Sequence, residues 1–175
     1  MKKISILALL ICLLPITQGC EDTKRDLSAS ERKVVIEDAK KTVQKVFESS
    51  NNHQFLEGLH YYSGDSDAYY TSNGEVFTLE ELKKSYREIA PSVEVLENSI
   101  DTWNATFLSA NTIAFTLPLH LKMKLVGVPE YNGQLVWTGI VQKRDKQWKI
   151  VQSHESWLNC VEVAAAFTPI PSENE

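Results

Sequence analysis

The chain has 175 residues, of which 43% are hydrophobic and 23% charged, and its formal net charge is −5. This length and composition predict one globular domain with an ordinary core. The charge lacks the basic excess on which non-sequence-specific nucleic-acid binding depends, so we expect no nucleic-acid partner.

The first 19 residues have the composition of a secretory signal. Lys2 and Lys3 precede an apolar run, residues 4–14, that is too short to span a bilayer as a permanent helix. We therefore exclude residues 1–19 from the fold and expect the mature protein to lie outside the cytoplasm. Their removal would leave a formal charge of −7, because both lysines are lost with them.

The residues around the expected cleavage site suggest a lipid anchor. The segment Ile-Thr-Gln-Gly-Cys, residues 16–20, resembles a bacterial lipoprotein signal, although that signal prefers an aliphatic residue at Thr17 and a small one at Gln18. The resemblance implies cleavage before Cys20, acylation of its thiol and anchoring in a membrane of the cell envelope. Ordinary secretion with cleavage at the same bond is the alternative.

The remaining chain divides into a tether, a domain and a tail. Residues 20–28 are polar and are expected to link the anchor to a domain over residues 29–158. Residues 159–175 contain two prolines and an acidic end, which predicts a loosely held tail. Once Cys20 carries lipid, Cys160 has no partner in its own chain, so no disulfide framework is expected.

Helical patterns fill the first half of the domain. Residues 28–31 form a capping box, and apolar side chains then recur at helical spacing over residues 29–49. A second, shorter helix is predicted over residues 53–62. A third begins at a further capping box, continues to Ile89 and is stopped by Pro91.

Strand patterns follow. A hairpin is predicted over residues 68–77 because Asn73-Gly74 supplies the positive φ angles of a tight turn. Beyond Pro91 the periodicity becomes alternating, with an apolar residue at every odd position over residues 113–125. Turn signals divide this region into four strands of an antiparallel meander. Pro118 cannot donate to a sheet ladder, which predicts an edge position or a bulge.

This order of elements resembles the nuclear transport factor 2-like fold, in particular its SnoaL-like branch. The stretches that carry the resemblance are Tyr61-Tyr62, residues 67–70, Asn73-Gly74-Glu75 and the closing residues 148–156. The resemblance covers residues 29–157. It implies an α+β, cone-shaped fold in which three helices pack on a strongly bent antiparallel sheet and enclose a pocket.

The closing strand supplies the first candidate site residues. If Trp148 and Ile150 fill the core, strict alternation points Gln152 and His154 toward the cavity mouth. An imidazole there could bind an acidic or carbonyl group, or act as a base. The alternative is a hydrogen-bonded histidine near a sheet edge. Many family members carry a second histidine where Gln152 stands, which counts against a histidine-pair mechanism.

Aromatic residues with one polar tip suit an apolar pocket that must orient a ligand, although each could equally be core. The candidates are Tyr61, Tyr62, Tyr70, Tyr86, Trp103 and Trp137. Asp67 could be a buried acid with a raised pKa, or a loop residue that caps its own backbone. The sequence has neither metal-ligand spacing nor a glycine-rich phosphate loop, so we expect no metal and no cofactor.

Three functions fit these residues. A membrane-anchored module that binds a small, partly apolar ligand is favoured, because aromatic and polar candidates occur without an assembled catalytic set. The first alternative is a proton-transfer isomerase or cyclase of the ketosteroid-isomerase kind, using His154 or Asp67. The second is a protein-interaction role, with a homodimer formed through the outer sheet face near Thr116 and Lys122.

Overall fold

The computed structural model describes residues 27–72 and 74–158. The signal, the lipidation site, Asn73, Cys160 and the tail therefore lie outside the described residues. Within the described part, no helix is both long and apolar enough to cross a membrane.

Three α-helices lie where the sequence predicts them. α1 spans Ala29–Asn51 and begins at the Ser28–Glu31 capping box. The second predicted helix is one α-helical turn, α2 (Phe55–Gly58), followed by the 3-10 turn η1 (Leu59–Tyr61). α3 spans Leu79–Ile89, begins at the Thr78–Glu81 capping box and leads into the 3-10 turn η2 (Ala90–Ser92).

Seven strands form one bent sheet with the order β2-β1-β7-β6-β5-β3, and β4 also pairs with β5. The strands are β1 (Tyr69–Ser72), β2 (Glu75–Phe77), β3 (Val93–Ile100), β4 (Asn104–Ser109), β5 (Thr112–Leu125), β6 (Tyr131–Arg144) and β7 (Gln147–Trp157). The expected sheet was wholly antiparallel, but β1 pairs with β7 in parallel, so the sheet is mixed.

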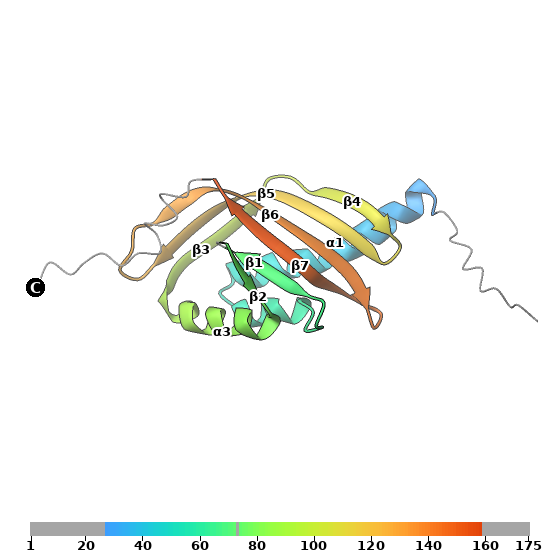
Figure 1. Cartoon of the computed structure of the whole chain (residues 1–175). Helices are drawn as coiled ribbons and strands as arrows, with labels where there is room; N and C mark the ends of the chain where they lie inside the picture. The colour runs from blue at the N-terminus through green and yellow to red at the C-terminus, as the bar shows by residue number, and fades with distance from the viewer. Residues whose placement is uncertain (1–26, 73, 159–175) are drawn as a thin grey trace, which may run out of the picture.

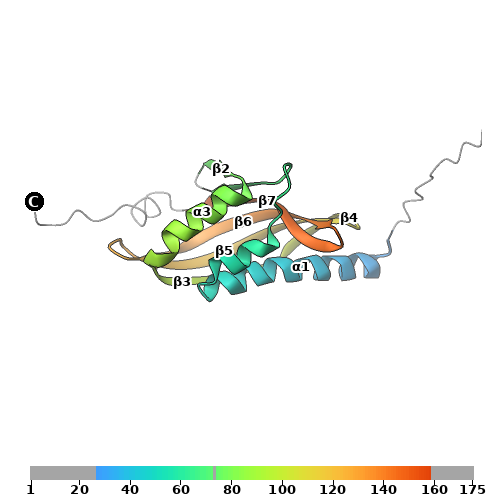
Figure 2. The same cartoon turned by 90° about the horizontal axis from the view of Figure 1, so that it is seen from below.

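The helices cover one face of this sheet. The sheet arches over them, and α1 and α3 both lie on its concave side (Figures 1 and 2). The apolar odd positions of β5 point to that side, where Ile113, Leu117 and Leu119 are almost completely buried. His120, on the even face of the strand, is exposed as predicted. The cone-shaped fold is thus confirmed.

Pro118 explains why the region after α3 has five strands rather than four. β5 is an inner strand, yet the carbonyl of Pro118 accepts a hydrogen bond from Asp101 N (3.0 Å), beside the break between β3 and β4. The backbone nitrogen of Pro118 faces the same side but carries no hydrogen, so it cannot donate the bond that a continuous neighbouring strand would accept. Pro118 therefore lies where no continuous strand pairs with β5 on that side. The single strand predicted after Pro91 is divided at this point into β3 and β4.

Candidate functional site

A cavity of about 370 Å³ lies between α3 and the concave face of the sheet. Its walls come from all parts of the fold, including α1, α3 and strands β1 to β3 and β5 to β7. Eight aromatic side chains line it: Phe47, Phe55, Tyr62, Tyr70, Phe77, Tyr86, Trp137 and Trp157. Such an apolar cavity with a few polar groups is typical of small-molecule sites, which span about 300–1,000 Å³.

A bulge in β7 decides which of its side chains enter the cavity. Val141 pairs with Ile150, but the neighbouring Ile140 pairs with Gln152, so Val151 is an extra residue in β7. Because a bulge inserts one extra residue, the side chains after it lie on the opposite face from the one that strict alternation predicts. Ser153 and Glu155 therefore line the cavity, whereas the side chains expected there belong to the opposite face.

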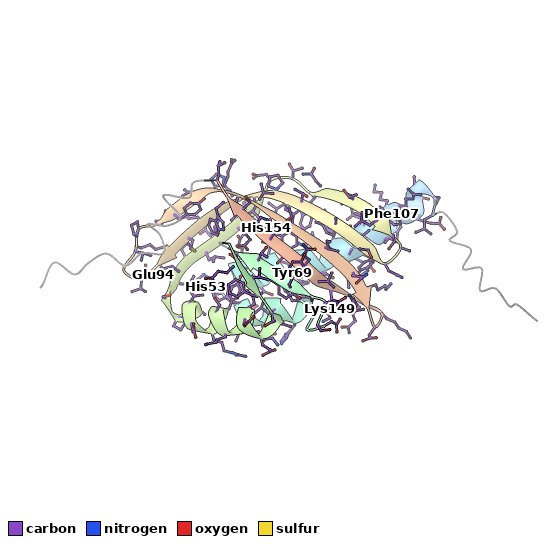
Figure 3. The ribbon with its side chains drawn as sticks, viewed as in Figure 1. His53, Tyr69, Glu94, Phe107, Lys149 and His154 are labelled. Atoms are coloured by element: carbon purple, nitrogen blue, oxygen red, sulfur yellow. The ribbon has the colours of Figure 1, made fainter. Side chains whose placement is uncertain are left out.

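The orientation predicted for Gln152 and His154 was therefore wrong. His154 pairs with Thr138 on β6 and with Thr71 on β1, and its side chain is exposed outside the cavity lining. Figure 3 labels it on β7, close to Tyr69 of the neighbouring strand. Gln152 shares this outer face. A ligand role for either residue stays a prediction, but it would have to operate on the outer surface of the sheet.

Glu155 is the acidic residue that the closing strand brings to the cavity. It lies opposite Trp137 on β6, and its Oε2 accepts a hydrogen bond from Ser72 Oγ at 3.2 Å. Burial raises the pKa of the Glu155 carboxyl, because protein atoms surround it and disfavour its charged form. Such an acid can hold a proton, release one to a ligand, or balance a positive charge.

Two tyrosines share the environment of Glu155. Burial raises the pKa of Tyr62 well above its ordinary value, and the neighbouring acidic groups of Tyr86 and Glu155 add to this shift. Burial, followed by the charge of Glu155, likewise raises the pKa of Tyr86. Both hydroxyls therefore remain protonated at neutral pH. The Tyr86 ring stacks on Phe55, with ring centroids 5.9 Å apart.

Four of the six candidate aromatic residues line the cavity, namely Tyr62, Tyr70, Tyr86 and Trp137. The hydroxyl of Tyr70 already hydrogen-bonds within the fold, because it lies 2.6 Å from the carbonyl oxygen of Ser63 and 3.0 Å from that of Ile150. Its ring packs edge-to-face on Tyr62. Tyr70 therefore contributes a rigid apolar wall rather than a free polar group.

Tyr61 and Trp103 are not among the lining residues. The Trp103 ring packs edge-to-face on Phe115, and the Lys40 ammonium lies 4.6 Å from its centroid. Of the two neighbouring candidates Tyr61 and Tyr62, Tyr62 is buried and lines the cavity, whereas Tyr61 is only partly buried and does not.

Asp67 is not a buried acid, which was one of the two roles considered for it. Its side chain is 61% exposed and accepts a hydrogen bond of 2.7 Å from Arg144 Nη2. That contact lowers the pKa of Asp67, which is opposite to the shift that a proton-transfer acid requires. Asp67 and Arg144 instead join the loop before β1 to the end of β6.

Glu155 is the site residue that sequence reasoning missed. The sequence carries only a partial signal, the two consecutive apolar residues Ile150 and Val151 in a strand that otherwise alternates. Within the described residues, no group of three or more His, Cys, Asp or Glu side chains could hold a metal ion.

The bent sheet, the helices on its concave side and the cavity between them define a nuclear transport factor 2-like protein. A family profile for the SnoaL-like domain matches residues 39–159, well over half of the chain. The chain belongs to the SnoaL-like family. No curated protein matches it.

Solved structures share the fold at low sequence identity. A proposed scytalone dehydratase from Novosphingobium aromaticivorans is 12% identical, with a TM-score of 0.67 over 75% of this chain and 89% of that one. A hexachlorocyclohexane dehydrochlorinase from Novosphingobium barchaimii is 16% identical, with a TM-score of 0.65 over 83% and 96%. At such identities the likeness extends to the fold alone.

Proposed function

We propose that this protein binds a small, partly apolar molecule in the cavity beneath the bent sheet. The observation that carries the proposal is the cavity itself, about 370 Å³ in volume and lined by aromatic side chains with Glu155 among them. An apolar body would pack against the rings, while the few polar groups would orient it.

Binding of a neutral fluorescent probe, N-phenyl-1-naphthylamine, tests this proposal. Ser85 lies on α3 and lines the cavity, so Ser85→Trp is expected to obstruct it and lower probe affinity by about tenfold. Lys84→Trp is the matched control, because Lys84 is exposed on the same helix and does not line the cavity. Equal probe binding by both variants, or none by the unmodified protein, would refute the proposal.

Proton transfer is a second candidate function, favoured by the raised pKa of Glu155. Structural neighbours described as a dehydratase and a dehydrochlorinase make elimination the reaction class to consider. Hydrogen–deuterium exchange of a cyclic ketone in D₂O, followed by NMR, measures this directly. Catalysed exchange that Glu155→Gln abolishes would support proton transfer, and exchange no faster than in buffer would exclude it for that probe.

We also propose that acylated Cys20 holds the domain at a membrane outside the cytoplasm, in the periplasm or at the cell surface. The charged start, short apolar run and Cys20 of the first 20 residues support this proposal.

A further inference from the structure

The charged side chains that line the cavity are all acidic. Two carboxylates, Glu75 and Glu155, are among the residues that line it, whereas none of its lining residues within the described chain is Lys, Arg or His. Placing an ionised carboxylate in a poorly hydrated site without a counter-charge destabilises the fold. A positively charged ligand would remove that cost.

Aromatic rings lie beside the same carboxylate. Trp137 is directly opposite Glu155 on the neighbouring strand. Tyr62 and Tyr86 line the cavity together with Glu155. The faces of aromatic rings carry negative potential and attract cations, including quaternary ammonium groups that cannot donate a hydrogen bond.

We propose that the ligand of this cavity is an organic ammonium ion with an apolar body, whose nitrogen lies against Glu155 among Tyr62, Tyr86 and Trp137. The inference rests on the proposed binding function and specifies its ligand class. A neutral carbonyl ligand could instead accept a proton from Glu155. Glu75, a second carboxylate that lines the cavity from an exposed position on β2, favours the cation, because its negative potential attracts a positive charge and offers nothing to a carbonyl oxygen.

The pH dependence follows from the groups that surround Glu155. Tyr62, Tyr70 and Tyr86 are the tyrosines of this cavity, and burial raises the pKa of each above the ordinary value. They remain neutral in the assay range, so the acidic side chains that line the cavity are Glu75 and Glu155, and burial raises the pKa of Glu155. Affinity for a cation should rise as pH rises through the pKa of Glu155, whereas affinity for a carbonyl ligand should fall.

Three probes that share one phenyl body separate these possibilities. They are the cation phenethyltrimethylammonium, the neutral 2-phenylethanol and the anion 3-phenylpropanoate, each measured by displacement of N-phenyl-1-naphthylamine between pH 5 and pH 8. We expect the cation to bind at least about tenfold more tightly than the alcohol at pH 8, and the anion to bind weakest.

Two pairs of variants identify the residues responsible. Glu155→Gln should abolish both the preference for the cation over the alcohol and the pH dependence of that preference. Glu94→Gln is the matched control, because it removes the same charge from an exposed position on β3 outside the cavity (Figure 3). Tyr86→Phe retains an aromatic ring and should preserve cation affinity, whereas Tyr86→Leu should lower it about threefold or more.

The outcomes distinguish this inference from the binding function on which it rests. If the fluorescent probe and the alcohol bind but the cation binds no more tightly, the ammonium assignment is wrong and the binding function stands. If no probe binds to the folded protein, both are overturned. A cation preference that persists in Glu155→Gln also overturns the assignment.

Discussion

At the scale of single residues, the cavity depends on a glycine beneath an indole ring. The Trp137 ring lies over Gly139, two residues along the same face of β6, and a Cβ atom at Gly139 would overlap that ring. The indole can therefore lie flat against the strand, and its other face is left to line the cavity.

Gly139→Ala should force the Trp137 ring into the cavity. We expect the free energy of unfolding to fall by about 1–3 kcal/mol, as for other overpacked cores, and probe affinity to fall with it. Urea unfolding and the displacement assay measure the two effects. Gly64→Ala is the control, because the nearest atom to its added Cβ would be Leu79 Cδ2 at 3.7 Å, an ordinary contact. Equal losses in both variants would contradict this account.

The same residues show how far alternation can predict a site. Tyr86 and Trp137 line the cavity, and each belongs to a regular element whose pattern the sequence predicts; their role toward a ligand stays a prediction. Glu155 and His154 exchanged their expected faces, because a single extra residue, Val151, shifts the numbering of every later position in β7. A bulge depends on strand pairing, which the sequence of one strand does not specify.

At the scale of elements, α3 forms one wall of the cavity and is secured at its start. Thr78 Oγ1 accepts a hydrogen bond from Glu81 N at 3.3 Å, and Glu81 Oε2 accepts one from Thr78 N at 2.8 Å. These bonds satisfy amide groups that the first turn of a helix leaves without intrahelical partners.

Thr78→Ala should remove half of this capping box. We expect it to lower the free energy of unfolding by about 1 kcal/mol and to speed amide exchange in the first turn of α3. Denaturant titration and hydrogen-exchange mass spectrometry measure these effects. Thr102→Ala, in the exposed break between β3 and β4, is the control and should change neither. Unchanged exchange in Thr78→Ala would show that the cap does not hold the helix.

The starts of helices were predicted correctly where a short local motif determines them. The capping boxes at Ser28 and Thr78 begin α1 and α3 as expected. The division of the strand region at Asp101 was missed, because it depends on which partner faces Pro118 across the sheet. The parallel pairing of β1 with β7 likewise joins segments about 80 residues apart.

At the scale of the whole molecule, the domain and its proposed anchor can be tested separately. Cys20→Ser should prevent acylation, which intact mass measures as the absence of the acyl groups, and should lower the share of protein held in the membrane by the lipid. Cys160→Ser is the control, because it makes the same sulfur-to-oxygen change elsewhere and should retain both the lipid and the membrane location. A mature protein that begins with unmodified Cys20 would overturn the anchor while leaving the domain unaffected.

The overall cone was predictable because the order of helices and strands restricts the possible packing. Long alternating strands must bury one face, and the helices that precede them supply the cover. The contents of the cavity were less predictable. They depend on which residues of distant segments, such as Ser72 and Glu155, come into contact.

The break between β3 and β4 also bears on solubility. An unclosed sheet has two edges whose free backbone groups can recruit strands from other molecules. One edge here is β2, which has only three residues. The other is interrupted at Asp101–Trp103, and the Asn51 side chain bonds both the N–H and the carbonyl of Asn98 on β3 (2.7 and 3.0 Å). Within residues 27–72 and 74–158, neither edge therefore offers a long open template, and we expect this to protect the sheet against edge-to-edge aggregation.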